Sequence, residues 1–376
     1  MTRLVYLDSA ATTFRKPASV PDAVLRAMRT MSSPGRGGYA SARAAEELLF
    51  RTRALAAETF GVDAPENVIF TDSATHGLNI AIKSLVPRGG RAIVSGYEHN
   101  AVTRPLHALD AETVVAASPL FDGEACVKAF SKAIRHGADA VICTAASNVF
   151  GFALPVEEVA ALCKRAGIPL IVDASQSAGV LPLDMGALGA AFVAMPGHKG
   201  LYGPQGTGLL LCGAEAKPLL EGGTGSESLR QEMPAFLPDR LEPGTHNIPG
   251  TAGLEAGLRF VRAKTPERIA RYERTLIRRA AEGLRRFAGV TVYAARSSAA
   301  QVGVLSFSVR GRESEEVAEA LAGRGVAVRA GYHCAPLAHR TAGTLEGGTV
   351  RVSVSAFNHE ADIDAFLRAM RQITAN

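Results

Sequence analysis

One lysine of this sequence stands in a setting that suits covalent chemistry with a carbonyl compound. Lys199 belongs to the glycine-rich segment GHKGLYGPQGTG, residues 197–208, which follows the apolar run AAFVAM. Glycines packed this densely indicate a backbone that bends sharply or comes close to another group. A lysine beside glycine is commonly just a solvated loop residue. An amine held in a constrained turn at the end of a strand, however, is typical of a Schiff-base lysine.

Residues elsewhere in the chain could serve a cofactor on that lysine. If Lys199 carries pyridoxal phosphate (PLP), the ring nitrogen needs a carboxylate and the phosphate needs N–H donors. Asp173, which ends the run PLIVD 26 residues before the lysine, could supply the carboxylate, and Gln176 could donate to the phenolic oxygen. Thr75 of TDSATHGLN could open a phosphate-binding helix, and His99 of YEHNAV could stack on the ring. Asp173 and Thr75 could each be an ordinary cap, but together these residues predict one site.

Apolar, β-rich runs must position these residues. They alternate with helical segments from about residue 60 to 212 and are apolar on both faces. This pattern predicts a mostly parallel sheet of seven strands covered by helices, with the binding site beyond the carboxyl ends of the strands. The predicted strands are NVIFT (67–71), RAIVS (91–95), TVVAA (113–117), DAVICT (139–144), PLIVDAS (169–175), AAFVAM (190–195) and GLLLC (208–212).

A second pattern begins near residue 251. A long helical region is predicted to run to about Phe287, with arginines mainly on one face, which favours a solvated helix face over a partner-binding surface. Its apolar residues at helical spacing are Ile269, Tyr272, Leu276, Ala280, Leu284 and Phe287. Strand and helix candidates then alternate to the end. We therefore predict a large α/β domain of residues 16–255 and a smaller α+β domain of residues 1–15 and 256–376.

Composition and charge exclude several classes of protein. The 376 residues carry a net charge of +5, and ten Lys or Arg against three Glu lie between Arg259 and Arg286. The positive charge is therefore one local patch, which argues against a nucleic-acid partner. The five cysteines are scattered without zinc spacing, which predicts no metal site and a reducing compartment, the cytoplasm. No run reaches the ~18 apolar residues of a membrane span, so no membrane association is expected.

The order of motifs resembles a known family. YLDSAATTF, SATHGLN, EHN, SNVFG, DASQSAG, GHKGLYGPQGTG, RAGYHCAP and TVRVS occur as in the fold-type I, class V PLP enzymes, and the resemblance covers essentially the whole chain. It is closest to the cysteine desulfurases of the short-loop, type II, SUF-like kind.

The resemblance implies roles for individual residues. Lys199 would bind PLP, Asp173 would pair with the pyridinium nitrogen and His99 would stack on the ring. The remaining cofactor contacts would be made by Gln176, Asn148, Ala74, Thr75 and His198, and by Thr245, which would reach the phosphate of the other subunit and so implies a homodimer.

Further residues would act on the substrate. Cys334 in RAGYHCAPL matches the nucleophilic cysteine, although a cysteine is often an inert buried thiol. The neighbouring His333 could assist formation of its thiolate. Arg329 and Arg351 match the residues that hold the substrate carboxylate, and Ala11 and Asn148 are placed at the substrate as well.

Three positions depart from the family pattern. Pro196 stands where a phosphate-binding hydroxyl is usual, Tyr39 where many relatives have a histidine, and Ser9 where asparagine is common. These departures bear on substrate preference and acceptor rather than on the cofactor.

The resemblance implies a PLP-dependent cysteine desulfurase that converts L-cysteine to L-alanine through a persulfide and passes the sulfur to an acceptor protein. Selenocysteine lyase, or another C–S lyase, is the alternative on the same scaffold. A transaminase has no use for a loop cysteine. A non-catalytic sulfur-transfer scaffold is the remaining hypothesis, but it does not need Lys199, Asp173 and Cys334.

Overall fold

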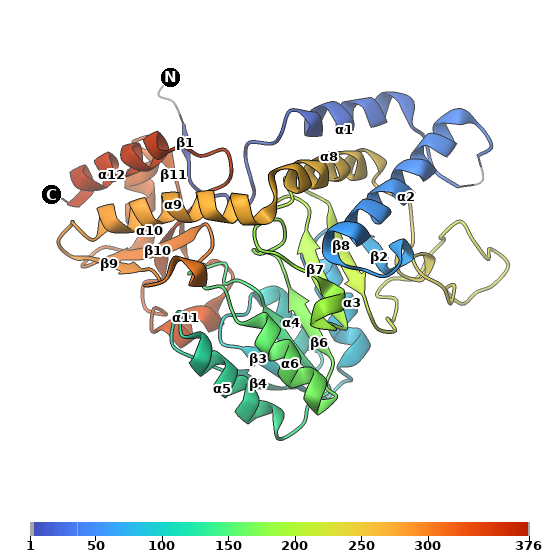
Figure 1. Cartoon of the computed structure of the whole chain (residues 1–376), viewed down its shortest axis with the longest axis horizontal. Coiled ribbons are helices and arrows are strands. Elements are labelled where there is room, and N and C mark those ends of the chain that lie inside the picture. The colour runs from blue at the N-terminus through green and yellow to red at the C-terminus, as the bar shows by residue number, and fades with distance from the viewer. Residues whose placement is uncertain (1–3, 36, 375–376) are drawn as a thin grey trace.

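A seven-stranded sheet forms the centre of the molecule. The computed structural model describes residues 4–35 and 37–374, and Figure 1 shows a second, smaller group of strands beside this sheet. The strand order is β2-β8-β7-β6-β5-β3-β4, so every predicted run is a strand of the sheet. The bounds are β2 (Val68–Thr71), β3 (Arg91–Ser95), β4 (Glu112–Ala116), β5 (Ala140–Thr144), β6 (Leu170–Asp173), β7 (Phe192–Pro196) and β8 (Gly208–Cys212).

One strand of this sheet runs against the others. β8 pairs antiparallel with both of its neighbours, β7 and β2, whereas the remaining pairs are parallel. Because β8 is reversed, the carboxyl ends of β2, β3, β5, β6 and β7 meet at one edge. The prediction of a mostly parallel sheet is confirmed.

Helices bury both faces of the sheet. On β5, Val141 and Cys143 belong to the apolar layer that includes α5 and α6, whereas Ala140 and Ile142 belong to the layer of α3 and α4. This alternation is the one that a strand covered on both sides requires. The helices of this part are α1 (Ser19–Thr30), α2 (Ala40–Phe60), α3 (Ala74–Leu85), α4 (Asn100–Ala108), α5 (Gly123–Ile134), α6 (Val156–Ala166) and α7 (Met185–Leu188).

The smaller group of strands comes from the C-terminal third of the chain. Four strands form an antiparallel sheet in the order β12-β13-β10-β9, and β1 (Val5–Tyr6) pairs in parallel with β11 (Val326–Ala327). The N-terminal segment thus lies beside the C-terminal strands, as expected. The other elements are β9 (Val290–Tyr293), β10 (Val304–Val309), β12 (Arg329–Gly331), β13 (Thr349–Ser353), α10 (Ser314–Ala322), α11 (Pro336–Ala342) and α12 (Glu360–Thr374).

The helical region predicted from 251 to about 287 is two helices. α8 (Ile248–Lys264) is followed by Thr265, whose φ of 63° breaks the helix. α9 (Pro266–Leu284) then begins at a proline. Proline is tolerated in the first turn of a helix but not in its interior, because it lacks the N–H that an interior residue donates. The predicted domain limit at residue 255 lies inside α8, and the division into two domains stays a prediction.

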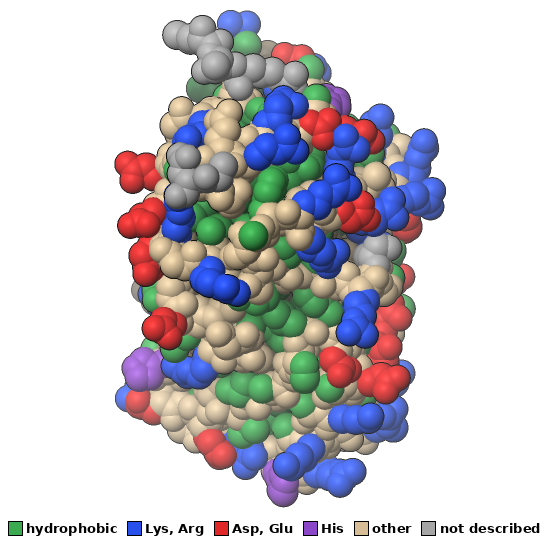
Figure 2. Space-filling view, turned by 90° about the vertical axis from the view of Figure 1, so that its left-hand side faces the viewer, with side chains coloured by type: hydrophobic (Ala, Val, Ile, Leu, Met, Phe, Trp, Pro, Cys, Tyr) green, Lys and Arg blue, Asp and Glu red, His purple; other side chains and the backbone are tan. Residues whose placement is uncertain are grey.

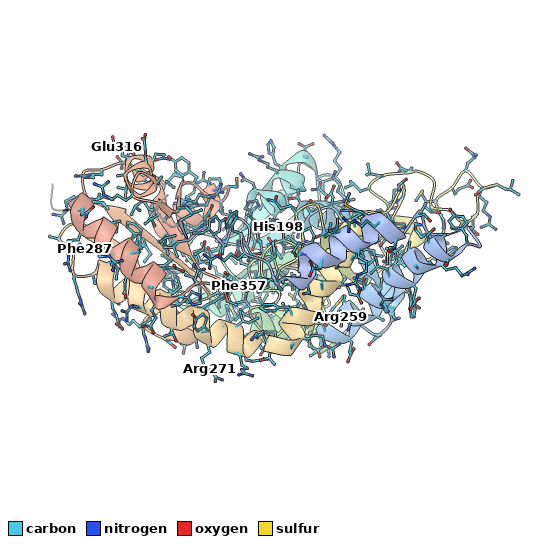
Figure 3. The ribbon with its side chains drawn as sticks, turned by 90° about the horizontal axis from the view of Figure 1, so that it is seen from above. His198, Arg259, Arg271, Phe287, Glu316 and Phe357 are labelled. Atoms are coloured by element: carbon cyan, nitrogen blue, oxygen red, sulfur yellow. The ribbon has the colours of Figure 1, made fainter. Side chains whose placement is uncertain are left out.

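The basic residues of α8 and α9 lie on the outside. Figure 3 shows Arg259 and Arg271 pointing away from the molecule. Arg279 pairs with Asp364 of α12 at 2.8 Å. Figure 2, which views the left-hand side of Figure 1, shows lysine and arginine side chains mixed with acidic and hydrophobic ones. Among the described helices, none combines the length and apolarity that crossing a bilayer requires.

Candidate active site

A cavity lies at the edge where the carboxyl ends of the strands meet, and the predicted cofactor residues line it. His198, which lies near the middle of the view in Figure 3, is one of them. Pro196, the departure from the family pattern, lines it too. The structure therefore brings together, from five loops distant in sequence, Ala74, Thr75, His99, Asn148, Asp173, Gln176, His198 and Lys199.

Lys199 is half-buried in the turn between β7 and β8. Burial lowers the pKa of its amine to about 8, against the opposing effect of the Asp173 carboxylate. No hydrogen bond joins its Nζ to another residue in the described part of the chain. The turn needs glycine next to the lysine, because a Cβ on Gly200 would come within 2.3 Å of the carbonyl oxygen of Ala178. The structure thus holds, in a constrained backbone, an amine that loses its proton more readily than an exposed lysine does.

The N-terminal segment binds the peptide that precedes Lys199. The carbonyl oxygen of His198 accepts from Thr13 N (3.1 Å), Thr13 Oγ1 (3.0 Å) and Lys16 Nζ (3.0 Å). Burial lowers the pKa of Lys16 to about 8, and its Nζ also donates to Thr13 Oγ1. We refer to residues 12–16 as the N-terminal strap. Residues 12–14 of the strap belong to the motif YLDSAATTF, but the sequence does not predict that the strap contacts the lysine turn.

Asp173 and His99 face the cavity from the ends of their strands. Asp173 is 2% exposed, and its Oδ1 accepts a hydrogen bond from Ser175 N at 2.9 Å. His99 caps α4 by accepting from Ala101 N at its Nδ1 (3.0 Å), so a neutral ring carries its proton on Nε2. Burial lowers the pKa of His99 and favours this neutral form. A flat, uncharged ring and a buried carboxylate suit the two roles that the resemblance implies.

The start of α3 offers donors for an anion. Ser73 caps the helix by accepting from His76 N (3.2 Å), which leaves the first N–H groups at Ala74 and Thr75 available. His198 Nδ1 is buried beside this end of the cavity and has no hydrogen-bond partner among the described residues. Pro196 contributes no hydroxyl. The backbone of α3 and the His198 imidazole are therefore the donors that this chain provides.

The two predicted substrate arginines are joined to one carboxylate. Arg351, 3% exposed, donates from Nη2 to Asp8 Oδ1 at 2.9 Å and from Nη1 to the carbonyl of Asn148 at 2.9 Å. Arg329, about half exposed, binds Asp8 Oδ2 at 2.9 Å. Arg351 Nε is buried and has no hydrogen-bond partner among the described residues. Asp8 stands in the motif YLDSAATTF, but the sequence does not predict its ion pairs with the two arginines.

Cys334 lies on an exposed loop between β12 and α11. Both His333 (φ 50°) and Cys334 (φ 56°) adopt the left-handed backbone region, which is uncommon for residues other than glycine. Two hydrogen bonds tie this loop to the cavity: Asn100 N donates to the Cys334 carbonyl (2.8 Å), and Asn148 Nδ2 donates to the His333 carbonyl (2.7 Å). The thiol is therefore both accessible and fixed near the cavity.

The neighbouring imidazole does not suit the role expected of it. His333 is buried, its Nε2 lies 3.1 Å from the carbonyl of Thr349, and burial lowers its pKa to about 2. Such a ring is a poor proton acceptor for the Cys334 thiol. The four other cysteines are buried, and burial raises the thiol pKa of each: Cys126, Cys143, Cys163 and Cys212.

Besides Arg329, Arg351 and Cys334, three more predicted positions lie outside the lining of this cavity. Thr245 is exposed in the loop before α8, and Tyr39 is exposed at the start of α2. Ala11 sits in the turn after Asp8, where its N–H donates to the Asp8 carbonyl at 3.1 Å. Their roles at the cofactor or substrate stay predictions. Within the described residues, no cluster of three or more His, Cys, Asp or Glu is placed to share a metal ion.

Comparison with known proteins identifies the class of this fold and site. The family model of the class V aminotransferases matches residues 5–366, so the chain belongs to that family. The resemblance seen in the motifs is thereby confirmed.

Several relatives of this chain are named as cysteine desulfurases. Probable cysteine desulfurases of Mycolicibacterium paratuberculosis and Pyrococcus abyssi are 33% and 29% identical over 98% of this chain, and a cysteine desulfurase of Yersinia pseudotuberculosis is 30% identical over the same share. The chain spans 55% of the Mycolicibacterium protein and 62% of a Mycobacterium leprae relative, but 94% and 93% of the Pyrococcus and Yersinia proteins.

Solved structures agree with these relatives. A cysteine desulfurase of Thermococcus onnurineus, solved in the apo form, superposes with a TM-score of 0.90 at 29% identity, covering 99% of this chain and 95% of that one. The cysteine desulfurase CsdA of Escherichia coli gives 0.84 at 26% identity, covering 98% and 94%. The predicted fold class is confirmed.

Proposed function

We propose that this chain is a PLP-dependent cysteine desulfurase that converts L-cysteine to L-alanine and carries the released sulfur on Cys334 as a persulfide. One observation carries the proposal: the exposed Cys334 sits on a loop that is hydrogen-bonded to Asn100 and to Asn148, and Asn148 lines the cavity that contains Lys199. Transamination would use the lysine but would have no use for the cysteine.

The residues of the cavity fit PLP. The half-buried Lys199 amine lacks a hydrogen-bond partner among the described residues, and the carboxylate of Asp173 suits a protonated ring nitrogen. The first N–H groups of α3 and the unpartnered His198 Nδ1 suit a phosphate, and Gln176 and His99 line the same space. When bound, PLP supplies a carbonyl that condenses with amines and a ring that draws electrons from the substrate Cα.

The chain's own residues would handle the proton and the carboxylate. Because burial lowers its pKa to about 8, Lys199 holds a substantial neutral fraction near neutral pH and can take the Cα proton of the substrate. Arg351 Nε, which has no partner among the described residues, can donate to the substrate carboxylate beside Asp8. The neutral ring of His99 can cover the reacting centre without adding a charge.

Cys334 would take the sulfur. Its thiolate forms an S–S bond to the substrate sulfur while the substrate C–S bond breaks, and the electron pair of that bond stays with the carbon. That carbon takes up a proton and becomes the methyl group of alanine. The persulfide left on Cys334 is exposed, so the thiol of an acceptor protein can reach it. Four buried free thiols and one exposed thiol support a reducing compartment, the cytoplasm.

The decisive experiment compares wild type with Cys334→Ala and with Cys163→Ala, a buried thiol, as control. Each protein is loaded with PLP, incubated with cysteine or with selenocysteine, and assayed for alanine with sulfide or selenide. We expect Cys334→Ala to lose at least ~100-fold of its cysteine turnover, because the sulfur then lacks its nucleophile. It should keep its absorbance near ~420 nm, typical of a lysine-bound PLP, and some selenocysteine turnover, since selenium leaves carbon more readily.

Two results would contradict the proposal. Near wild-type cysteine turnover in Cys334→Ala would make the protein a simple C–S lyase. A wild-type protein that turns over selenocysteine but not cysteine would make it a selenocysteine lyase.

A further inference from the structure

A second, smaller cavity lies behind the lysine turn, on the side of α9. Its lining comes from the N-terminal segment, the two turns that carry Gln176 and Lys199, and the C-terminal part of the chain. Two of its polar residues have no part in the proposed reaction: Ser9 and Glu273. About 30 Å³ of this cavity is open to the centres of water molecules, which is room for one or two of them.

Neither Ser9 nor Glu273 has a side-chain hydrogen-bond partner among the described residues. Glu273 is 3% exposed, and no hydrogen bond or ion pair joins its carboxyl group to another described residue. Its neighbour Arg274 instead donates to the carbonyls of Gln301 (2.9 Å) and Ala299 (3.3 Å). Ser9 is 5% exposed, and its Oγ is buried without a partner. Buried polar groups are satisfied by protein or by water, so both groups point to bound water.

The carboxyl group is held closely on one side. A Cβ placed on Gly303 would come within 2.4 Å of Glu273 Oε2, so that oxygen lies against the backbone before β10. An ionised carboxylate without a counter-charge is costly in such a place, whereas a neutral carboxyl can both donate and accept a hydrogen bond.

We propose that this cavity is a buried water site in which Glu273 keeps its proton and, through water, hydrogen-bonds Ser9 and supports the turn that carries Lys199. Glu273 is then a positioning residue that acts on Lys199 from behind. Burial of the carboxyl, which raises the pKa of Glu273 to about 8, agrees with this assignment. The other titratable or charged groups that face it are Lys199, Tyr202 and Arg274.

The proton can be tested without PLP, by urea unfolding of the cofactor-free protein from pH 5 to pH 9. An unfolded glutamate loses its proton near pH 4.5, whereas folded Glu273 keeps it to about pH 8. Wild type therefore loses more stability than Glu273→Gln does as pH rises through this window, since Glu98, whose pKa burial also raises to about 8, is present in both proteins. Each pH unit should change the ratio of the two unfolding constants about tenfold. Glu267→Gln, an exposed control on α9, should show no such change, and a flat ratio for Glu273→Gln would overturn the assignment.

The water is tested in a high-resolution crystal structure, which does not depend on a variant folding. We expect ordered water within hydrogen-bond distance of Glu273 and of Ser9 Oγ. A dry cavity, or a carboxyl paired directly with Ser9, would overturn the water site. Ser9→Ala removes a single hydroxyl and should lose the water molecule bound to it.

The positioning of Lys199 by Glu273 rests on the proposed function. Its test distinguishes a failure of the positioning role from a failure of the proposed function. In the PLP-loaded protein, the absorbance of the lysine-bound cofactor should titrate identically in wild type and Glu273→Gln below about pH 8, and differently above it, where the wild-type carboxyl ionises. Identical titrations on both sides of pH 8 would overturn the positioning role. A protein that binds no PLP would instead overturn the proposed function and leave the unfolding test intact.

Discussion

At the scale of the residue, the site depends on an amine that is costly to bury. Lys199 has a pKa of about 8, and the largest cause is its removal from water. The interior that makes this amine reactive therefore destabilises the protein while the amine is charged. Hydrogen bonds from the side chains of the N-terminal strap to the His198 carbonyl hold the backbone next to this amine.

Replacing this lysine should therefore stabilise the cofactor-free protein while it abolishes turnover. The shift from 10.5 to about 8 corresponds to a cost on the order of 3 kcal/mol while both states are protonated. Wild type regains this stability as pH rises from about 8 to 10.5, because the folded lysine loses its proton before the unfolded one. Lys199→Met should thus unfold at higher urea at pH 7, and its advantage should shrink toward pH 10.5.

Urea unfolding at several pH values measures this difference, with Lys164→Met, an exposed lysine of α6, as the control. If Lys199→Met were no more stable than wild type at pH 7, burial of the charged lysine would not lower the free energy of unfolding. The lowered pKa of Lys199 would then need another cause.

The sequence predicted the residues of the cavity well because each follows an apolar strand, and parallel strands end at one edge. Lys199, Asp173 and His99 could be placed in this way. Asp8 could not, because its partner Arg351 is 343 residues away and no local pattern predicts such an ion pair. The neutral state of His333 depends on burial against Thr349, which is likewise invisible in the sequence.

At the scale of the element, the N-terminal strap determines where the lysine turn lies. Lys16 reaches the His198 carbonyl from outside the sheet, and Thr13 binds the carbonyls of both His198 and Lys199. The strap therefore holds the turn without touching the interior of the cavity. The apolar runs that predict the strands do not indicate these contacts, because the strap has no regular secondary structure of its own.

Lys16→Met should weaken PLP binding without removing it. A hydrogen bond from a charged donor is worth about 1.5–3 kcal/mol, so we expect a roughly tenfold or larger rise in the dissociation constant. Titration of the cofactor-free protein with PLP, followed by absorbance, measures it. Arg15→Met changes the exposed neighbouring residue and should bind PLP as wild type does. An equal effect of both variants would show that the strap acts through net charge rather than through its hydrogen bonds.

At the scale of the whole molecule, the role proposed for Thr245 requires a second chain. Thr245 is exposed and does not line the cavity of its own chain, which agrees with a residue that serves a partner subunit. We therefore expect a homodimer at micromolar concentration and two sites, each built from both subunits.

Mixing two impaired variants tests this arrangement. Lys199→Ala lacks the lysine, and Thr245→Ala should bind the phosphate of PLP at least about tenfold more weakly. In a mixed dimer, one site has Lys199 of one subunit and Thr245 of the other, so activity should return at limiting PLP. Turnover of the mixture, with sedimentation to confirm dimers, measures the rescue. If confirmed mixed dimers regain no activity, Thr245 contacts the phosphate bound in its own chain.

The reversed strand β8 also sets the order in which the site can form during synthesis. β2 ends at Thr71 and has β8 as its neighbour in the sheet, but β8 begins only at Gly208. The ribosome must therefore complete β8 before β2 can pair, and until then the start of α3 has no fixed place opposite Lys199. Arg351 and Cys334 leave the ribosome later still. A nascent chain that stops before β8 would thus expose an unpaired strand edge, and the cofactor cavity is assembled as a late event in the folding of this protein.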